Sequence, residues 1–380
     1  MIEPWRVGLL FSSTGHTARI EKTQLDATLL AIKEINTAGG VLNRPIVPIV
    51  YNPDSQPELY GHYAAQLMKK HGINCIFGCY ISSGRQAVLP VVERLNGLLF
   101  YPTLYEGFEF SPNVIYTGAS PNQNSGILCS YLMKNYGRSF YFVGSDYVYA
   151  RQSNRLMKEY LRKDRGFVVG ERYLALDASR RSFDDVLTDI MVTKPDVIFS
   201  TVVGHSTSFL YQAYAKHGLD PLKIPIASLT TSETEVVDMG AEVGVNHITA
   251  ACYFQTVNSE NNRKFIASYR KEYGPESETN FCAEAAYFQM HLFAKALINS
   301  GTMMTEKLRS SILDTDVDAP QGKVSINRES GHADLWSRIG KINDKGQFDI
   351  VFESSLQVKA DPYLIAYGSN AIDVFTTKES

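Results

Sequence analysis

The hydrophobic pattern in the first third of the chain switches repeatedly between strand and helix spacing. Residues 6–11 form a short apolar run, and Leu25, Leu29, Ile32 and Ile35 then recur at helical intervals. The same alternation gives strands at 46–51, 75–77 and 98–101 and helices at 57–72 and about 83–94. Four βα units in a row predict a parallel sheet with helices on both faces.

The alternation starts again after residues 120–125, a turn-rich stretch that we interpret as a loop and as the first domain crossing. Strands are predicted at 140–143, 167–169, 197–201 and 224–229, followed by an extended segment at 250–254, helices at 261–273 and 283–300, and strand character at 324–326 and 339–342. The late helices are expected to pack on the first sheet. The predicted fold is α/β, with two doubly wound parallel-sheet lobes joined by multiple crossovers around a ligand cleft. The N-terminal lobe comprises 1–121 plus about 254–328, and the C-terminal lobe comprises 122–253 plus about 329–380.

Composition narrows the class of protein. The chain has 380 residues, 37 basic and 40 acidic, and its net charge of -3 argues against a nucleic-acid binder driven by global charge. The five cysteines are odd in number and irregularly spaced, so they form no disulfide framework and favour a reducing compartment. The first residues have no export-signal pattern, and no apolar stretch approaches the roughly 20 residues of a membrane span. We therefore expect a cytoplasmic protein without membrane insertion.

Hydroxyl and aromatic side chains gather where the predicted strands end. Ligands of open α/β sheets bind beyond the carboxyl ends of the strands, where helix N-termini present free N–H groups. The residues at these ends are Tyr80, Ser82, Ser83, Tyr101, Thr103, Leu104, Tyr147, Tyr149, Val203, Thr230 and Thr231. Such a lining suits a small, polar and mostly neutral molecule. Two other interpretations stay open: the tyrosines as amphipathic core or rim residues, and Ser82 or Ser83 as a helix cap.

Motifs for catalysis are weak. The chain has no G-x-S-x-G elbow, G-x-G-x-x-G loop or P-loop, and the Cys75 and Cys79 pair is interpreted as buried small hydrophobes and not as zinc ligands. Glu106, Asp146 and Glu233 have the chemistry of acid and base catalysts, but hydrogen bonding to loops or to a ligand N–H is favoured. His16 and His205 are interpreted as solvated loop residues, and an amidohydrolase with Cys79 or Cys252 as nucleophile is a weak alternative. We expect neither catalytic residues, nor a metal, nor a cofactor.

Several strings resemble the type I periplasmic binding-protein family, which includes branched-chain amino-acid receptors. The stretch after the first helix, with the sequence AGGVLNRP at 38–45, is one of them. Further strings are similar to those of the amide sensors of aliphatic amidase operons, and they are GCYIS (78–82), YPTLYEGFEFSPN (101–113), PNQNS (121–125), GSDYVY (144–149), FSTVVG (199–204), IASLTTSE (226–233) and DAPQG (318–322). Binding proteins of urea and short-amide transporters are similar over the same segments.

This resemblance implies a two-lobed, non-catalytic protein that closes on a short-chain aliphatic amide such as acetamide. It implies regulation of amidase expression, in which the sensor holds an RNA-binding antiterminator inactive and releases it when amide binds. Tyr80, Ser82, Tyr101 and Thr103 would contact the ligand from one lobe, and Tyr147, Tyr149, Val203, Thr230 and Thr231 from the other. Leu104 stands where the resemblance has proline, which bears on pocket size. A homo-oligomer without direct nucleic-acid binding is also expected. The alternative is the substrate-binding protein of an amide or urea ABC transporter.

Overall fold

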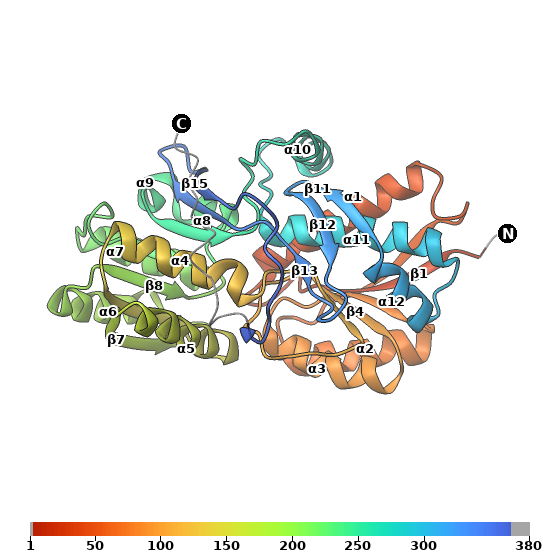
Figure 1. Cartoon of the computed structure of the whole chain (residues 1–380), viewed down its shortest axis with the longest axis horizontal. Helices are drawn as coiled ribbons and strands as arrows, with labels where there is room; N and C mark the ends of the chain where they lie inside the picture. Colours follow the sequence, from red (N-terminus) through yellow and green to blue (C-terminus); the bar gives the residue numbers. More distant parts are fainter. Residues whose placement is uncertain (1–2, 366–380) are drawn as a thin grey trace. The chain divides into compact units, whose positions relative to one another are not determined.

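The computed structural model describes residues 3–365 and divides the chain into two compact units (Figure 1). Unit 1 contains Met1–Ala119 and Val257–Leu335, and unit 2 contains Ser120–Thr256 and Trp336–Ser380. The chain therefore passes three times from one unit to the other. Residues 329–335, which the sequence analysis placed in the C-terminal lobe, belong to unit 1. Residues 366–380 of that predicted lobe lie outside the described part of the chain.

Unit 1 is built on a five-stranded sheet in which every pair of neighbours is parallel. Its order is β2-β1-β3-β4-β5. The strands are β1 (Trp5–Leu10), β2 (Ile46–Tyr51), β3 (Cys75–Gly78), β4 (Leu98–Tyr101) and β5 (Val114–Tyr116). The first four match the predicted strands, whereas β5 was not predicted because a strand of three residues shows no hydrophobic period.

Helices from both ends of the sequence cover this sheet. They are α1 (Ala18–Thr37), α2 (Pro57–His71), α3 (Ser82–Arg94), α10 (Glu260–Tyr273), α11 (Phe281–Ser300) and α12 (Thr305–Leu313). The late helix α11 packs on this sheet, as predicted, because its Phe293 ring meets the stacked rings of Phe77 and Phe100 edge-on at 5.3 and 5.9 Å. It also packs against α1. Unit 1 thus needs segments that lie more than 150 residues apart in the sequence.

A small antiparallel sheet completes unit 1. It consists of β11 (Asp316–Ala319), β12 (Gly322–Ile326) and β13 (Ala333–Asp334), in the order β11-β12-β13. Because β13 pairs with β12, the chain stays in unit 1 until Leu335, which explains why the predicted last crossing near residue 328 came too early.

Unit 2 has a seven-stranded mixed sheet in the order β15-β14-β10-β9-β8-β6-β7. The parallel strands are β6 (Ser139–Ser145), β7 (Phe167–Leu174), β8 (Val197–Thr201), β9 (Ile226–Ser228) and β10 (Ile248–Ala251). The last two strands, β14 (Arg338–Ile342) and β15 (Phe348–Glu353), join antiparallel to β10 and to each other.

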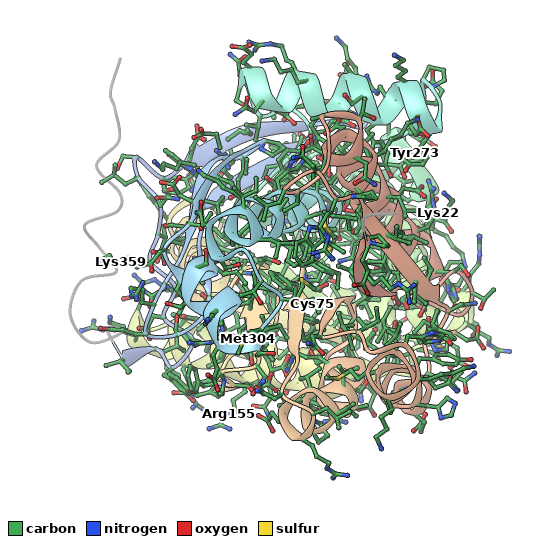
Figure 2. The ribbon with its side chains drawn as sticks, turned by 90° about the vertical axis from the view of Figure 1, so that its right-hand side faces the viewer. Lys22, Cys75, Arg155, Tyr273, Met304 and Lys359 are labelled. Atoms are coloured by element: carbon green, nitrogen blue, oxygen red, sulfur yellow. The ribbon has the colours of Figure 1, made fainter. Side chains whose placement is uncertain are left out.

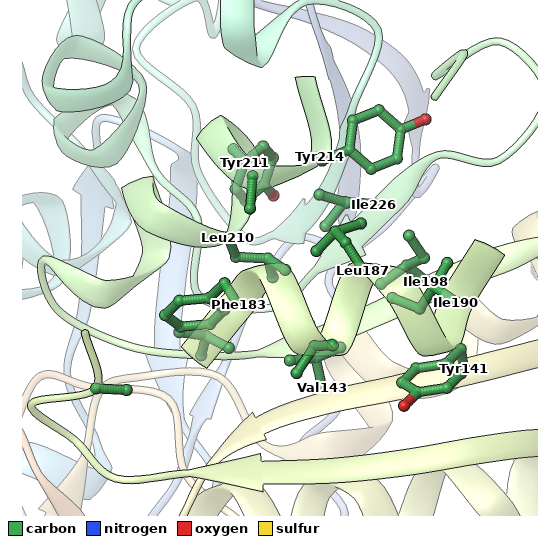
Figure 3. Packing of buried hydrophobic residues seen from close by; sticks show 14 of the residues in the cluster. Tyr141, Val143, Phe183, Leu187, Ile190, Ile198, Leu210, Tyr211, Tyr214 and Ile226 are labelled. Carbon is green, nitrogen blue, oxygen red and sulfur yellow. The ribbon is translucent and has the colours of Figure 1, made fainter. Parts of the chain in front are cut away.

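The helices of unit 2 are α4 (Pro121–Asn135), α5 (Val148–Lys163), α6 (Arg180–Thr193), α7 (Ser206–Lys216), α8 (Glu233–Met239) and α9 (Ala241–Gly244). Apolar side chains of α6 and α7 pack on β6, β8 and β9, as Figure 3 shows for Phe183, Leu187, Leu210, Ile198 and Ile226. These residues are fully buried, so the packing follows the periodicity that predicted the elements.

The turn-rich stretch at 120–125 is the first turn of α4, so its prediction as a loop was wrong. Ser120 is the N-cap, Pro121 follows in the first turn, and the Ser120 N–H donates to Gln123 Oε1 at 2.9 Å. Serine, proline and asparagine are frequent both in turns and at helix starts, and the capping box decides for the helix. No helix among residues 3–365 is both long enough and apolar enough to cross a bilayer.

Candidate functional site

In unit 1 the ends of β3 and β4 bring several predicted residues together. The Tyr101 hydroxyl donates to the Tyr80 carbonyl at 2.9 Å, and the Thr103 hydroxyl donates to the Cys79 carbonyl at 3.3 Å. The end of β3 also lies close against the end of β1. Only glycine fits at position 78, since a Cβ there would lie 2.2 Å from the Leu10 carbonyl oxygen. Because Tyr101 and Thr103 are buried and bonded to the preceding strand end, they fix the course of the backbone around Tyr80.

Ser82 does not cap α3, although the sequence suggested a cap. The N-cap is Ile81, and Ser82 is the first helical residue, so its hydroxyl points to another element and donates to Glu106 Oε2 at 2.6 Å. Ser83 follows on the same turn and is half-buried. Ser82 therefore links the end of β3 to the loop that follows β4.

A buried ionic cluster lies directly behind these residues. Arg85, on the first turn of α3, is completely buried, and its Nη2 donates to Glu106 Oε1 at 2.8 Å. Its Nε and Nη2 also donate to the two carboxylate oxygens of Glu109, at 2.8 and 3.2 Å. The bidentate arrangement on Glu109 uses the planar fork of the guanidinium. One cation thus faces two carboxylates, and the cluster carries one excess negative charge.

Aromatic rings enclose the cluster. The guanidinium of Arg85 lies 5.0 Å from the Tyr101 ring centre and 4.9 Å from that of Tyr105, and the Tyr116 hydroxyl donates to Glu109 Oε1 at 2.8 Å. The His332 ring stacks on Tyr116 with centres 4.0 Å apart. Burial lowers the pKa of His332 to about 4, so its ring is neutral. Its Nδ1 donates to the Ser330 carbonyl, which leaves Nε2 to accept the Tyr105 hydroxyl at 2.5 Å.

The loop after β4 is also held from α1 and from the segment after β5. Gln24 Nε2 donates to the Pro102 carbonyl at 3.2 Å and to the Thr103 hydroxyl at 3.1 Å. Gly118 sits against the same loop, and a Cβ there would lie 2.0 Å from the Thr103 carbonyl carbon. Leu104 is buried next to this contact. The backbone of Thr103 and Leu104 is therefore fixed on two sides.

A second buried carboxylate, that of Glu21 on α1, lies near the end of β1. It accepts hydrogen bonds from the Ser12 N–H at 2.7 Å, the Thr17 hydroxyl at 2.5 Å and the Tyr60 hydroxyl at 2.6 Å. Burial raises the pKa of Glu21 to about 7 despite these donors. Glu21 therefore titrates near neutral pH within the strand-end region of unit 1.

In unit 2 the predicted residues again lie at strand ends. Tyr147 is the N-cap position of α5, and Tyr149 lies in the first turn with its ring centre 6.0 Å from that of Tyr147. Tyr149 is buried and Tyr147 is half-buried. Val203 follows β8, and its N–H donates to Ser145 Oγ at 3.2 Å, which ties the end of β8 to the end of β6.

Thr230 and Thr231 follow β9 and share one acceptor. Both backbone N–H groups donate to Ser228 Oγ at 3.0 Å. The Thr230 hydroxyl donates to the Val202 carbonyl at 2.8 Å, and the Thr231 hydroxyl lies 2.9 Å from the Tyr211 hydroxyl. The buried threonines therefore belong to a hydroxyl network that joins the ends of β8 and β9.

The three carboxylates considered as acid and base have structural partners. Glu106 binds Ser82 and Arg85, Asp146 is exposed and pairs with Arg151 at 2.8 Å, and Glu233 Oε1 accepts the Gln255 N–H at 2.6 Å. Only the Glu233 contact is a hydrogen bond to a loop, since Glu106 and Asp146 bind side chains of the helices α3 and α5.

The thiols and histidines of the weak catalytic alternative occupy different environments. Cys79 and Cys252 are buried, and burial raises the pKa of Cys79, which disfavours a thiolate nucleophile. His16 and His205 are exposed, as predicted. Within residues 3–365 no group of three or more His, Cys, Asp and Glu side chains is placed to hold a metal ion.

Sequence reasoning missed Arg85, Glu109 and His332. Arg85 lies one turn after Ser82, and the half-buried Glu109 stands between Phe108 and Phe110, whose exposed rings suggest a surface loop. A usable signal was the presence of two glutamates in an otherwise aromatic loop. His332 could not be found because it lies just before β13, more than 200 residues from the loop after β4.

Comparisons with known proteins agree on one fold. The profile of the family described as "Periplasmic binding protein domain" matches residues 5–368. A solute-binding protein of an ABC transporter from Rhodopseudomonas palustris BisB5, solved with 3,4-dihydroxybenzoic acid, has a TM-score of 0.84 at 22% identity, covering 94% of this chain and 99% of that one. The branched-chain amino-acid binding protein LivJ from Streptococcus pneumoniae, solved with isoleucine, has a TM-score of 0.82 at 17% identity, covering 93% and 100%.

Curated relatives are distant in sequence. Leu/Ile/Val-binding protein homolog 6 from Brucella abortus is 24% identical over 302 residues, which is 77% of each chain. Limonene hydroxylase from Geobacillus stearothermophilus is 25% identical over 126 residues, which is 33% of this chain and only 23% of that protein. The fold is therefore that of periplasmic binding proteins, as the sequence predicted.

Proposed function

Because the chain belongs to the periplasmic binding protein domain family, we propose that it is a non-enzymatic binding protein for a small uncharged molecule with N–H groups. A short aliphatic amide or urea has this chemistry. Two of its solved structural relatives bind 3,4-dihydroxybenzoic acid and isoleucine; the first belongs to an ABC transporter and the second to a branched-chain amino-acid transporter. We propose the same transport role for this chain, as its ligand-binding component.

The observation that carries the ligand class is the charge balance around Arg85. A carboxylate ligand needs a cation, and the buried cation in the strand-end cluster of unit 1 already faces two carboxylates, those of Glu106 and Glu109. The excess charge is negative, so a carboxylate brought to this cluster would be repelled. An amide offers N–H donors instead, and it needs no ion pair.

The remaining groups suit an amide. The strand-end region of unit 1 contains Tyr80, Ser82 and Thr103, and that of unit 2 contains tyrosines and threonines. Hydroxyls and backbone groups provide acceptors for the two N–H hydrogens and donors for the carbonyl oxygen. We propose that both strand-end regions contact the ligand. The cleft predicted between the lobes stays a prediction.

Calorimetry tests the ligand class directly. Acetamide, propionamide, butyramide and urea are titrated into the full chain, with isoleucine and 4-hydroxybenzoate as anionic or zwitterionic comparisons. Binding of at least one amide or urea, with no heat from isoleucine or the benzoate, is the expected result. Tight binding of either comparison and none of an amide would overturn the proposal.

Two variants test the site. Tyr80→Phe in unit 1 and Tyr149→Phe in unit 2 each remove one hydroxyl, and we expect each to weaken amide binding about 10-fold, which corresponds to about 1.4 kcal/mol. The matched control is Tyr131→Phe, at a half-buried tyrosine on α4. If all three variants bind the amide with equal affinity, the hydroxyls of Tyr80 and Tyr149 do not contact the ligand.

Transport has its own test. Uptake of radiolabelled amide by cells that lack the chain is compared with uptake by cells that carry it. Loss of uptake supports the transport role, and unchanged uptake at limiting amide concentration argues against it.

The second candidate function is the cytoplasmic amide-responsive regulator that holds an RNA-binding antiterminator. The observation that favours it is the state of Cys75, Cys79 and Cys129, which are buried thiols outside any disulfide, as expected in a reducing compartment. In this case deletion of the gene raises amidase activity in the absence of amide and leaves uptake unchanged. Cell fractionation measures the location.

A further inference from the structure

One segment of unit 2 concentrates positive charge. Residues 134–172 contain nine Lys and Arg against four Asp and Glu, whereas the whole chain has a net charge of -3. This segment runs from the end of α4 through β6 and α5 to β7. Arg155, in the middle of α5, is exposed and labelled at the margin of the side-chain view in Figure 2. A field of one sign on a chain of the opposite net charge attracts an anionic partner.

Two hollows flank the C-terminal end of α5. The first, of about 590 Å³, is lined by Ser130, Met133, Lys134, Arg138, Lys163, Asp164 and Arg165. In the part of the chain that the structure describes, the exposed side chains of Lys134, Arg138 and Arg165 have no ion-pair partner. Lys134 lies in the last turn of α4, where its charge stabilises the helix dipole. Arg138 and Arg165 lie beyond the ends of α4 and α5, so the helix dipoles do not account for these two cations.

The second hollow, of about 420 Å³, lies between α5 and the start of β7. It is lined by Lys158, Leu161, Arg162 and residues 166–171. Lys158 pairs with Glu171 and Arg162 with Glu159, so its charges are balanced. Its apolar contribution comes from Leu161, Val168 and the exposed ring of Phe167. This hollow is therefore suited to apolar side chains, in contrast to the basic hollow next to it.

The strand that lines the second hollow, β7, has an open edge. β7 is the last strand of its sheet and pairs with β6 on one side, and no other strand among residues 3–365 pairs with its outer side. Its first four residues, FVVG, carry no charge. Edge strands usually carry charged residues, proline or a covering segment, because free N–H and C=O groups accept another chain. The first four residues of β7 carry neither a charge nor a proline, so this part of the edge can pair with another chain.

We propose that the α5–β7 groove, made of these two hollows and the outer edge of β7, docks an extended acidic segment of a partner protein. The segment adds a strand to β7, places apolar side chains on Leu161 and Phe167, and directs carboxylates to Lys134, Arg138 and Arg165. A phosphate or an oligonucleotide satisfies the cations but uses neither the strand edge nor the apolar hollow. This groove lies at the amino end of β7, so it differs from the strand-end regions assigned to the small ligand.

Fluorescence anisotropy with the full chain tests the proposal. The probe is a fluorescein-labelled ten-residue peptide of alternating Glu and Val. The variant Lys134→Ser, Arg138→Ser, Arg165→Asn removes the three unpaired cations, and asparagine tolerates the left-handed φ of +63° at position 165. We expect this variant to bind at least about 10-fold more weakly than the parent chain. The matched control replaces three other exposed lysines, Lys69, Lys70 and Lys345, and retains the parent affinity.

Three further probes decide between partner classes. A peptide with Gln in place of Glu and a Glu–Val peptide N-methylated at alternate residues each lose one part of the recognition, so both are expected to bind at least 10-fold more weakly. Inorganic triphosphate and a ten-residue oligothymidylate supply charge without a peptide backbone. Equal binding of the N-methylated peptide, of triphosphate or of the oligonucleotide would overturn the proposal, as would unchanged affinity of the triple variant.

Discussion

Replacing Arg85 with methionine tests the buried ion cluster of unit 1. The change keeps an unbranched apolar stem but removes three charged hydrogen bonds, of 2.8, 2.8 and 3.2 Å, to Glu106 and Glu109. Their side chains are only 7% and 16% exposed, so water cannot replace the lost cation. Breaking a buried ion pair from one side costs about 3 to 5 kcal/mol. Since two carboxylates lose their partner, we expect a loss of about 4 kcal/mol in the free energy of unfolding at pH 7.

Urea unfolding measured by Trp5 fluorescence reports on unit 1. Trp5 is buried on β1, and a Trp336→Phe background removes the other tryptophan, which belongs to unit 2. Adding Glu106→Gln and Glu109→Gln to the Arg85→Met chain is expected to restore about half of the loss, because no buried charge then lacks a partner. Arg155→Met, at an exposed cation, is the control and changes stability by less than about 0.5 kcal/mol. A loss below about 1 kcal/mol for Arg85→Met, or no recovery in the triple variant, would refute the reasoning.

Three other expectations follow from single residues. Because burial raises the pKa of Glu21 from 4.5 to about 7, the folded chain keeps a proton that the unfolded chain releases in this window. The free energy of unfolding therefore falls by up to about 3 kcal/mol as pH rises from 4.5 to 7, and Glu21→Gln reduces that slope in urea titrations; an unchanged slope contradicts the assignment. Gly118→Ala places a Cβ 2.0 Å from the Thr103 carbonyl carbon, so calorimetry should show amide binding weakened more than 10-fold; parent-like affinity would mean that Thr103 plays no part. The five buried cysteines should react with Ellman's reagent only after unfolding in urea, and a fast native thiol would contradict their burial (Figure 2 labels Cys75).

Periodicity was sufficient for the framework of both sheets. Strands such as β3 and β8 are buried along their whole length because parallel strands are covered on both faces, and the helices between them show a clear apolar stripe. The short strands β5 and β13 were missed because three and two residues give no period. The first turn of α4 was misread because its residues suit a loop equally well.

The site residues that were predicted lie at positions that the sheet topology determines. The residues that were missed matter only because of how side chains pack in the folded chain. Tyr80 and Tyr101 could be named because the carboxyl ends of parallel strands lie at one edge of a sheet. Arg85 could not be named, since its importance depends on two glutamates that only the folded loop brings within 3.2 Å. His332 immediately precedes β13, whose pairing with β12 had no local signal in the sequence.

The order in which the chain alternates between units has a consequence during synthesis. Helix α1 emerges from the ribosome with the first segment, but its packing partner α11 follows the whole 120–256 segment. At 5 to 20 residues per second this delay is on the order of ten seconds. During that interval the apolar side of α1 is exposed to solvent. A nascent chain interrupted before residue 281 would therefore expose an aggregation-prone helix to chaperones and to other nascent chains.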